Sequence, residues 1–266
     1  MRIAIDAMGG DNAPGEIIEG VVEAGKVLDK EDELILIGDE DEIKRYLKKF
    51  KAKKLSIDIV HAPEVIGMDE PPVESIRKKK KSSISIMAKM GSRGEADAVI
   101  SAGNTGACVA ACQLRMRNLP GVNRPGISAI MPTFGGPVAM CDVGANVACK
   151  PINLYQYAVM SSILITHMVG IENPRIGLLG IGEEAAKGNE LVKRTRELIL
   201  SDPNLNFIGN IEGRDILKGV CDVAICEGFV GNVILKMSEG WGKTISGLLR
   251  QELKTGFWSK MGSFLS

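Results

Sequence analysis

The stretch that decides the fold is IGLLGIGEEAAKGNELVKRTRELIL, residues 176–200. It opens with a short apolar run, passes through a glycine-rich turn and continues with the apolar spacing of an amphipathic helix. A strand, a turn and a helix in this order form the basic unit of an α/β fold.

Short β-branched runs alternate with helical patterns along the rest of the chain. Strands are predicted at 3–7, 34–38, 57–60, 98–102, 127–131, 138–142, 176–180, 206–209 and 223–226, and helices include 16–28, 42–50, 154–168 and 189–200. This alternation predicts an α/β fold, a mainly parallel sheet with helices on both faces. No low-complexity linker interrupts the pattern. We therefore expect one α/β catalytic core over 1–240, followed by an amphipathic helical segment over 241–266.

The composition is that of a globular protein and argues against several classes. Of the 266 residues, 45% are apolar and 4% aromatic, and 33 Lys and Arg balance 33 Asp and Glu. This argues against wholesale electrostatic binding of nucleic acid and against single-strand stacking platforms. Six cysteines without CxxC spacing and only two histidines predict a reducing compartment and no structural metal site. Without a leader-like start or an apolar run of about 18 residues, we expect a cytoplasmic protein that does not span a membrane.

Five predicted strands end in glycine-rich turns that carry Asp, Asn or Thr, at residues 6–12, 101–106, 142–146, 180–189 and 227–232. In a parallel sheet the carboxyl ends of the strands lie on one edge, where open α/β sheets bind ligands. Each turn leads into a helix whose first N–H groups are unpaired and whose dipole favours negative charge. Glycine allows an anion to approach these donors closely. The turns therefore predict a binding edge for a small anion.

Lys187 is the lysine of this edge. It follows Glu183 by four residues and Glu184 by three, so on a helix it would form an ordinary surface ion pair with one of them. Its place in a glycine-rich turn equally favours contact with a phosphate, or with the oxygen that gains charge during acyl transfer. Both interpretations stay open on sequence grounds.

Three local motifs carry less weight. Residues 180–185 fit the G-x-G-x-x-[GA] dinucleotide pattern, but two glutamates stand where a pyrophosphate would approach. Residues 242–244 (GKT) resemble the end of a P-loop, but Met237 stands where the opening glycine is required. Cys108 and Cys112 lie four residues apart on an Ala-rich helix, which is typical of core packing.

Together the motifs resemble the PlsX family of bacterial phosphate acyltransferases. The resembling segments occur in family order over nearly the whole chain: IDAMGGD (5–11), HAPEVI (61–66), SAGNTGA (101–107), DVGAN (142–146), GEEAAKGNE (182–190) and EGFVGNV (227–233). The resemblance implies a fold related to phosphotransacetylases and isocitrate-dehydrogenase-like proteins, and a homodimer. It also implies transfer of a long-chain acyl group from acyl carrier protein to inorganic phosphate, giving acyl phosphate for phospholipid synthesis.

For such a reaction we expect no metal, no cofactor and no covalent enzyme intermediate, because phosphate is itself a nucleophile that has to be positioned. The expected catalytic residues are Lys187 and Asn232, which would stabilise the oxyanion, and Asn104, which would hold phosphate. The expected substrate-binding residues are Gly103, Thr105, Gly106, Asp142, Asn146, Asp6, Gly9 and Gly10. Among these, Asp142 and Asn146 are expected to orient substrate or neighbouring groups.

A basic run suggests a protein partner. By charge patterning alone, Arg77, Lys78, Lys79, Lys80 and Lys81 would be a solvated surface. The resemblance turns this run into a predicted docking site for the strongly acidic acyl carrier protein.

The last residues suggest a second contact. Phe257, Trp258, Met261, Phe264 and Leu265 have the spacing of one apolar helix face. That face would pack on the core or at a dimer interface, or would lie in the inner face of the cell membrane with which the family is peripherally associated. Family chains normally continue further, so we expect a truncated or incomplete chain.

Three alternative functions stay open. One is a phosphotransacetylase-like transferase that uses acyl-coenzyme A, since its phosphate edge would look alike. Another is an NAD-dependent oxidoreductase, which cofactor binding would reveal. The third is a non-catalytic membrane-surface scaffold, which would bind liposomes without phosphate-dependent turnover.

Overall fold

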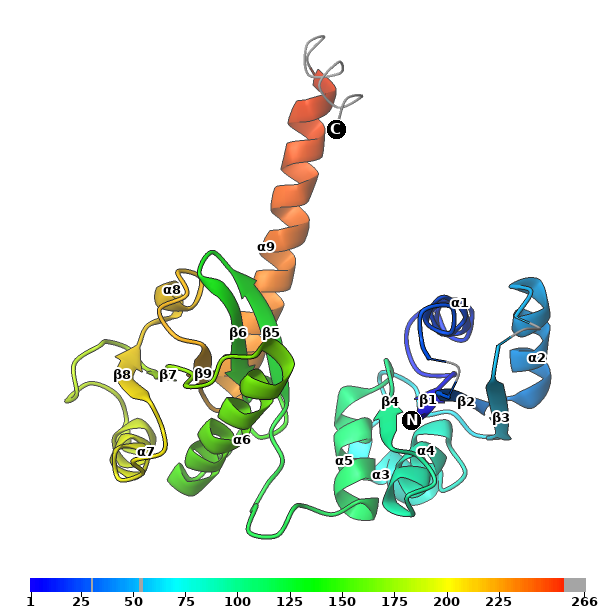
Figure 1. The fold of residues 1–266 in the computed structure, drawn as a ribbon, viewed down its shortest axis with the longest axis horizontal. Helices are drawn as coiled ribbons and strands as arrows, with labels where there is room; N and C mark the ends of the chain where they lie inside the picture. Colours follow the sequence, from blue (N-terminus) through cyan, green and yellow to red (C-terminus); the bar gives the residue numbers. More distant parts are fainter. Residues whose placement is uncertain (30, 53–54, 256–266) are drawn as a thin grey trace. The chain divides into compact units, whose positions relative to one another are not determined.

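The computed structural model describes residues 1–29, 31–52 and 55–255. The chain forms two compact units, Met1–Gly121 and Val122–Ser266, each with its own sheet (Figure 1). A single core over 1–240 is the expectation from sequence. In the structure the strands divide between two sheets, and residue 240 lies inside one long helix, α9 (Gly228–Thr255). Hydrophobic patterning reports that a strand is buried, but it does not report which strands share a sheet.

The first unit is built on a four-stranded parallel sheet with the order β3–β2–β1–β4. Its strands are β1 (Arg2–Asp6), β2 (Glu33–Gly38), β3 (Ile57–His61) and β4 (Ala98–Ile100). Its helices are α1 (Gly15–Ala24), α2 (Glu40–Lys49), α3 (Pro72–Lys78), α4 (Ser83–Ser92) and α5 (Thr105–Arg115). The chain moves outward from β1 to β3 and then returns to place β4 on the other side of β1. The strand order therefore reverses between β1 and β4, the point at which open α/β sheets hold ligands.

Alternate residues of the central strands pack on opposite faces of this sheet. Ile5 of β1 joins Ile18 of α1 and Ile43 of α2 in one apolar cluster. Its neighbour Ala4 joins Met87 of α4 in another. Because side chains alternate along a strand, a run that is apolar at every position is buried on both faces, as parallel strands usually are.

The second unit is built on a five-stranded sheet with the order β5–β6–β9–β7–β8. Its strands are β5 (Ser128–Thr133), β6 (Gly136–Cys141), β7 (Ile176–Leu179), β8 (Phe207–Ile211) and β9 (Val223–Ile225). Its helices are α6 (Pro151–Val169), α7 (Glu190–Leu200), α8 (Gly213–Ile216) and α9. Strands β5 and β6 pair antiparallel and the remaining pairs are parallel. The carboxyl ends of β6, β9 and β7 are therefore neighbours on one edge.

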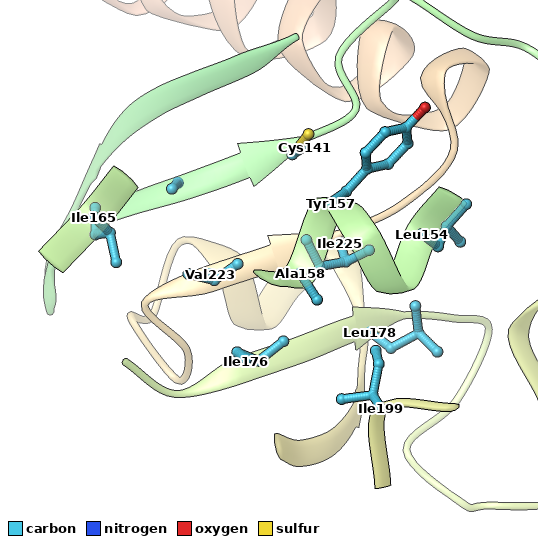
Figure 2. Close-up of a cluster of buried hydrophobic side chains, with 11 residues drawn as sticks. Cys141, Leu154, Tyr157, Ala158, Ile165, Ile176, Leu178, Ile199, Val223 and Ile225 are labelled. Atoms are coloured by element: carbon cyan, nitrogen blue, oxygen red, sulfur yellow. The ribbon is translucent and has the colours of Figure 1, made fainter. Parts of the chain in front are cut away.

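The core of this unit also lies on both sides of its sheet. Figure 2 shows Cys141 of β6, Ile225 of β9 and Leu178 of β7 on the side of the sheet that Tyr157 and the rest of α6 cover. On the other side, Ile234 of α9 packs against a second cluster from the same strands. Helices thus cover both faces and leave the strand edge for the connecting loops.

All nine predicted strands are present, each within two residues of its predicted bounds. The parallel-dominated sheets with covering helices confirm the predicted α/β fold class. Of the predicted C-terminal segment, residues 241–255 continue helix α9, whereas Phe257, Trp258, Met261, Phe264 and Leu265 lie outside the described residues. Among the residues described, no helix combines the length and apolarity needed to cross a membrane.

Candidate functional site

The first group of predicted site residues gathers where β1 and β4 end. The Asp6 carboxylate is buried and accepts hydrogen bonds from Ser101 Oγ (2.8 Å) and the Met8 N–H (3.1 Å). Ser101 Oγ in turn accepts a hydrogen bond from the Gly103 N–H (3.1 Å). Asp6 therefore ties the two loops at the reversal point of the sheet to each other.

Two glycines fit closely around this network. A Cβ on Gly9 would lie 2.9 Å from Gly103 N and would also collide with the Asp6 carboxylate, so a larger residue would force the loops apart. Gly10 follows with a φ of 120° and lies against the Ala102 carbonyl. The structure thus brings Asp6, Gly9, Gly10 and Gly103 together, with the carboxylate used for shaping the loops.

Asn104 is occupied by contacts within its own unit. Its Oδ1 accepts a hydrogen bond from the Ala107 N–H (3.0 Å) and caps helix α5. Its Nδ2 lies 3.0–3.2 Å from the carbonyl oxygens of Gly67, Met68 and Glu70. A side-chain amide has two N–H donors, so both are engaged within the protein. The side chain holds a loop against a helix and has no donor left for phosphate.

Thr105 and Gly106 begin helix α5, and both are exposed. Their N–H groups precede the first bond of the helix, which runs from the Cys108 N–H to the Asn104 carbonyl. Within the described part of the chain, neither of these two N–H groups has a hydrogen-bond acceptor. Such donors, at the positive end of a helix dipole, favour an anion.

The residues of the predicted docking run, 77–81, have two different roles. Lys79 forms an ion pair with Glu70 and also donates to the Val65 carbonyl (2.7 Å). The hydrogen bond from Lys79 and that from the Gly67 N–H lower the pKa of Glu70 to about 2. Lys79 is thus used inside the unit, and the exposed part of the run is Arg77, Lys78, Lys80 and Lys81.

In the second unit, Asp142 organises the loop that follows β6. It is fully buried, and its Oδ1 accepts hydrogen bonds from the N–H groups of Ile127 (3.2 Å), Gly144 (3.1 Å) and Ala145 (2.9 Å). Its Oδ2 accepts from the Asn146 N–H (2.8 Å) and from Asn146 Nδ2 (3.1 Å). Five donors on one carboxylate make Asp142 a positioning residue rather than a group that faces a substrate.

Asn146 extends this network to helices α6 and α9. Its Nδ2 also donates to the Pro125 carbonyl (2.6 Å) and to the Tyr157 hydroxyl (2.9 Å). Its backbone carbonyl accepts a hydrogen bond from the Gly228 N–H (2.8 Å), at the first residue of α9. The loop after β6 and the start of α9 are therefore held as one piece.

Asn232 lies beside this piece. A Cβ built on Gly144 would lie 3.5 Å from Asn232 Oδ1, which places the Asn232 side chain next to the loop after β6. A Cβ on Gly231 would collide with the Asp142 carbonyl, so α9 approaches the loop this closely because residue 231 is glycine. Asn232 itself is exposed in the first turn of α9, and no hydrogen bond of its side chain occurs among the described residues.

Lys187 lies in a loop and not on a helix. Helix α7 begins at Glu190 with Asn189 as its N-cap, so residues 180–189 form a long connection after β7. Lys187 is exposed, and across residues 1–29, 31–52 and 55–255 its ammonium group pairs with neither Glu183 nor Glu184. The surface ion pair that the sequence left open depended on helical spacing, which the loop removes.

The start of α9 contains a residue that sequence analysis did not single out. The Glu227 carboxylate accepts hydrogen bonds from the N–H groups of Phe229 (2.7 Å) and Val230 (3.0 Å). It therefore satisfies the second and third N–H donors of α9 and occupies the position at which an anion would otherwise bind. An acidic residue directly before a predicted helix is the signal that could have identified it.

The competing motifs are not supported by the structure. Residues 242–244 lie inside α9, so they form no P-loop. Ten residues separate β7 from α7, whereas a dinucleotide turn leads directly into its helix. Burial raises the pKa of Cys141 to about 12 and that of Cys221 to about 11, which keeps these thiols protonated. In the described part of the chain, no three His, Cys, Asp or Glu side chains cluster as metal ligands.

The sequence profile of a family described as "Fatty acid synthesis protein" matches residues 1–266. The chain belongs to this family. A phosphate acyltransferase from Thermoanaerobacterium thermosaccharolyticum is 48% identical over 265 residues, which are 100% of this chain and 78% of the relative. A phosphate acyltransferase from Trichormus variabilis is 47% identical over 266 residues, 99% of this chain and 77% of the relative. These relatives confirm the resemblance to the PlsX family, and with it the prediction of an acyltransferase.

Solved structures support the fold independently of sequence. A phosphotransacetylase from Streptococcus pyogenes matches with a TM-score of 0.66 at 18% identity, over 91% of this chain and 82% of that chain. The EutD phosphotransacetylase from Staphylococcus aureus matches with a TM-score of 0.64, also at 18% identity and over the same shares. At this level of identity the similarity concerns the fold, and it confirms the predicted relation to phosphotransacetylases.

Proposed function

We propose that this protein transfers a long-chain acyl group from the thioester of acyl carrier protein to inorganic phosphate, giving an acyl phosphate for phospholipid synthesis. The observation that carries the proposal is Lys187, an exposed cation in a glycine-rich loop at the carboxyl edge of a sheet and without an acidic partner in the described part of the chain. Membership of the fatty acid synthesis family and the names of its relatives support the acyl and phosphate parts of the reaction.

In this reaction a phosphate oxygen attacks the thioester carbonyl carbon, the carbonyl oxygen gains negative charge, and the C–S bond then breaks. The electron pair leaves with sulfur, which takes up a proton to give the free thiol. Lys187 stabilises the oxygen that gains charge, and the exposed Asn232 amide provides a second donor. The protein supplies position and charge, because phosphate at neutral pH is already nucleophilic.

The remaining predicted residues either donate hydrogen bonds to phosphate or hold loops in place. The Thr105 and Gly106 N–H groups are the phosphate donors in this proposal, since they are unpaired at a helix N-terminus. Asp6, Asp142 and Asn146 support loops, and Asn104 changes from the predicted catalytic role to a positioning role because its donors are engaged.

We extend the proposal to partners and location. Arg77, Lys78, Lys80 and Lys81 form an exposed basic surface, which suits an acidic carrier protein. A homodimer, a cytoplasmic location and peripheral contact with the inner face of the cell membrane are inferred from the family resemblance.

The function is tested by measuring thiol release from palmitoyl-carrier protein with and without inorganic phosphate, while hydroxylamine traps acyl phosphate. We expect release that depends strictly on phosphate. Lys187→Ala is expected to lower kcat about 10²–10³-fold, as loss of one oxyanion donor does in other acyl transfer enzymes. Lys193→Ala is the matched control, because Lys193 is an exposed lysine on the neighbouring helix α7.

Near-normal turnover of Lys187→Ala would refute the assignment of Lys187 as the group that stabilises the oxygen that gains charge. Turnover of palmitoyl-coenzyme A in preference to palmitoyl-carrier protein would retain the chemistry and replace the proposed donor. Liposome binding without any phosphate-dependent thiol release would refute the proposed reaction as a whole.

A further inference from the structure

A cavity of about 350 Å³ opens in the second unit beside the loop that carries Lys187. Leu179, Gly180 and Ile181, at the end of β7, form one wall of the cavity. The first turns of α7 and α9 contribute Val192 and Val230 to its other walls. The cavity therefore lies at the carboxyl edge of the sheet, within the same set of loops as the candidate site. Its volume is at the lower end of the range of about 300–1,000 Å³ typical of small-molecule sites.

The walls of this cavity are apolar, and its polar side chains are turned to the backbone. Asn189 uses its Oδ1 to accept from the Val192 N–H (3.0 Å). Glu227 uses both carboxylate oxygens on the Phe229 and Val230 N–H groups. No charged oxygen among the described lining residues is thus left to bind a cation or a polar headgroup, and the surface favours a hydrocarbon ligand.

A second cavity of about 670 Å³ adjoins the first, and Gly213 and Ile234 line both. It follows α9, where Met237, Trp241 and Ile245 contribute apolar surface one helical turn apart. These three side chains are about half exposed although they are large and apolar. We call the apolar surface of these two cavities, from the loop that carries Lys187 along α9, the apolar path.

We propose that this path binds the acyl chain of the substrate, with the carbonyl end at the Lys187 loop and the methyl end passing Gly213 and Ile234 towards Trp241. This inference rests on the proposed function and adds to it the binding site of the hydrocarbon chain. Each methylene that leaves water contributes about fourfold in binding. The path therefore favours longer acyl chains, whereas an enzyme with only the phosphate edge would show no such trend.

Gly213 offers a way to block the path, because it lines both cavities. A Cβ on Gly213 would meet no atom within 4 Å, and its φ lies outside the region reserved for glycine. A leucine is therefore accommodated without backbone strain at residue 213, which lines both cavities. Gly20→Leu is the matched control, because Gly20 also has open space around it and lies on α1 of the other unit.

The first measurement is kcat/KM for phosphate-dependent cleavage of carrier-protein thioesters of six to sixteen carbons. We expect kcat/KM of the unaltered protein to rise with chain length. Gly213→Leu is expected to keep the values for the shortest chains and to lose at least tenfold on the longest, while Gly20→Leu follows the unaltered protein. A length profile that Gly213→Leu leaves unchanged, with phosphate-dependent cleavage intact, refutes the acyl path and leaves the proposed function standing.

The second measurement detects the hydrocarbon without turnover. Trp241 is one of two tryptophans, so Trp258→Phe leaves it as the sole donor for energy transfer to cis-parinaric acid, a fluorescent fatty acid. We expect energy transfer that palmitate displaces and that Gly213→Leu weakens. This result without phosphate-dependent cleavage of any thioester supports the path and refutes the proposed reaction. Absence of energy transfer refutes the path.

Discussion

Asp142→Asn tests whether the loop after β6 is held by one buried carboxylate. The substitution is nearly isosteric, so it changes hydrogen bonding with little change in volume. An asparagine in this place keeps one carbonyl oxygen, which still accepts from Ile127, Gly144 and Ala145. Its NH₂ group replaces Oδ2 and faces the two donors of Asn146. In both places a contact between a donor and an acceptor is replaced by a contact between two donors.

The expected loss follows from the contact of the Asn146 N–H, whose acceptor Asp142 Oδ2 is replaced by a donor. Asn146 Nδ2 keeps the Pro125 carbonyl and the Tyr157 hydroxyl as acceptors, so the Asn146 N–H is the donor left without a partner, at a cost of about 1–3 kcal/mol of unfolding free energy. With a urea m-value of about 2 kcal/mol/M, the unfolding midpoint falls by about 0.5–1.5 M. We also expect loss of phosphate-dependent turnover, because Asn146 and the start of α9 move with the loop.

Tryptophan fluorescence in urea measures this loss in the relevant unit. In a Trp258→Phe background the remaining tryptophan is Trp241 of α9, so its signal follows the unit that contains Asp142. Glu197→Gln is the matched control, since it neutralises an exposed carboxylate on α7 of the same unit. An Asp142→Asn midpoint within 0.2 M of the control, roughly 0.4 kcal/mol, would contradict the hydrogen-bond argument.

Three further predictions concern the first unit. Asn104→Ala removes the cap of α5 and the contacts to the loop before α3, so we expect about 1–3 kcal/mol less stability in a urea titration followed by circular dichroism; an unchanged titration would refute its positioning role. The Lys79 hydrogen bond lowers the pKa of Glu70 from its ordinary value of 4.5 to about 2, so this carboxylate stabilises the fold above pH 4.5 and loses that contribution as the pH falls towards 2. Glu70→Gln is expected to flatten the acid limb of a plot of stability against pH, and a limb of unchanged slope would contradict the ion pair. The double charge reversal Lys80→Glu with Lys81→Glu is expected to raise KM for acyl-carrier protein at least tenfold at low salt and to leave KM for acyl-coenzyme A within twofold. Equal effects on both donors would argue against a carrier-protein docking surface.

The positions of the strands and of the glycine-rich loops were predictable from the sequence. The run from Ile3 to Ile5 is buried on alternate faces by α1 and α4. Because both faces are buried, every residue of the run is apolar, and such a run predicts a buried parallel strand. The need for glycine at residue 9 is likewise visible, because a strand followed by two glycines predicts a tight turn. Family membership followed from the order of several such loops.

The tertiary structure decided which polar residues are used inside the protein. Asn104 meets the Gly67 carbonyl 37 positions away, and Asp142 meets the Ile127 N–H 15 positions away. Residue type and strand-end position favoured a substrate-facing role for Asn104, because a sequence pattern does not show which donors are already satisfied. Lys187 presents the opposite case, since only the structure shows that its loop leaves it without the helical ion pair.

The sequence by itself therefore determined the α/β class, the strand positions and the family, since these depend on local apolar spacing and on glycine at close turns. The division into two sheets and the satisfaction of each buried polar group were decided by the tertiary structure. Both depend on partners distant in the chain, where hydrogen-bond geometry and not local propensity selects the contact. The apolar path past Gly213 was also decided by the tertiary structure, because its walls come from helices α6, α7, α8 and α9 and from strands that meet only in the folded unit.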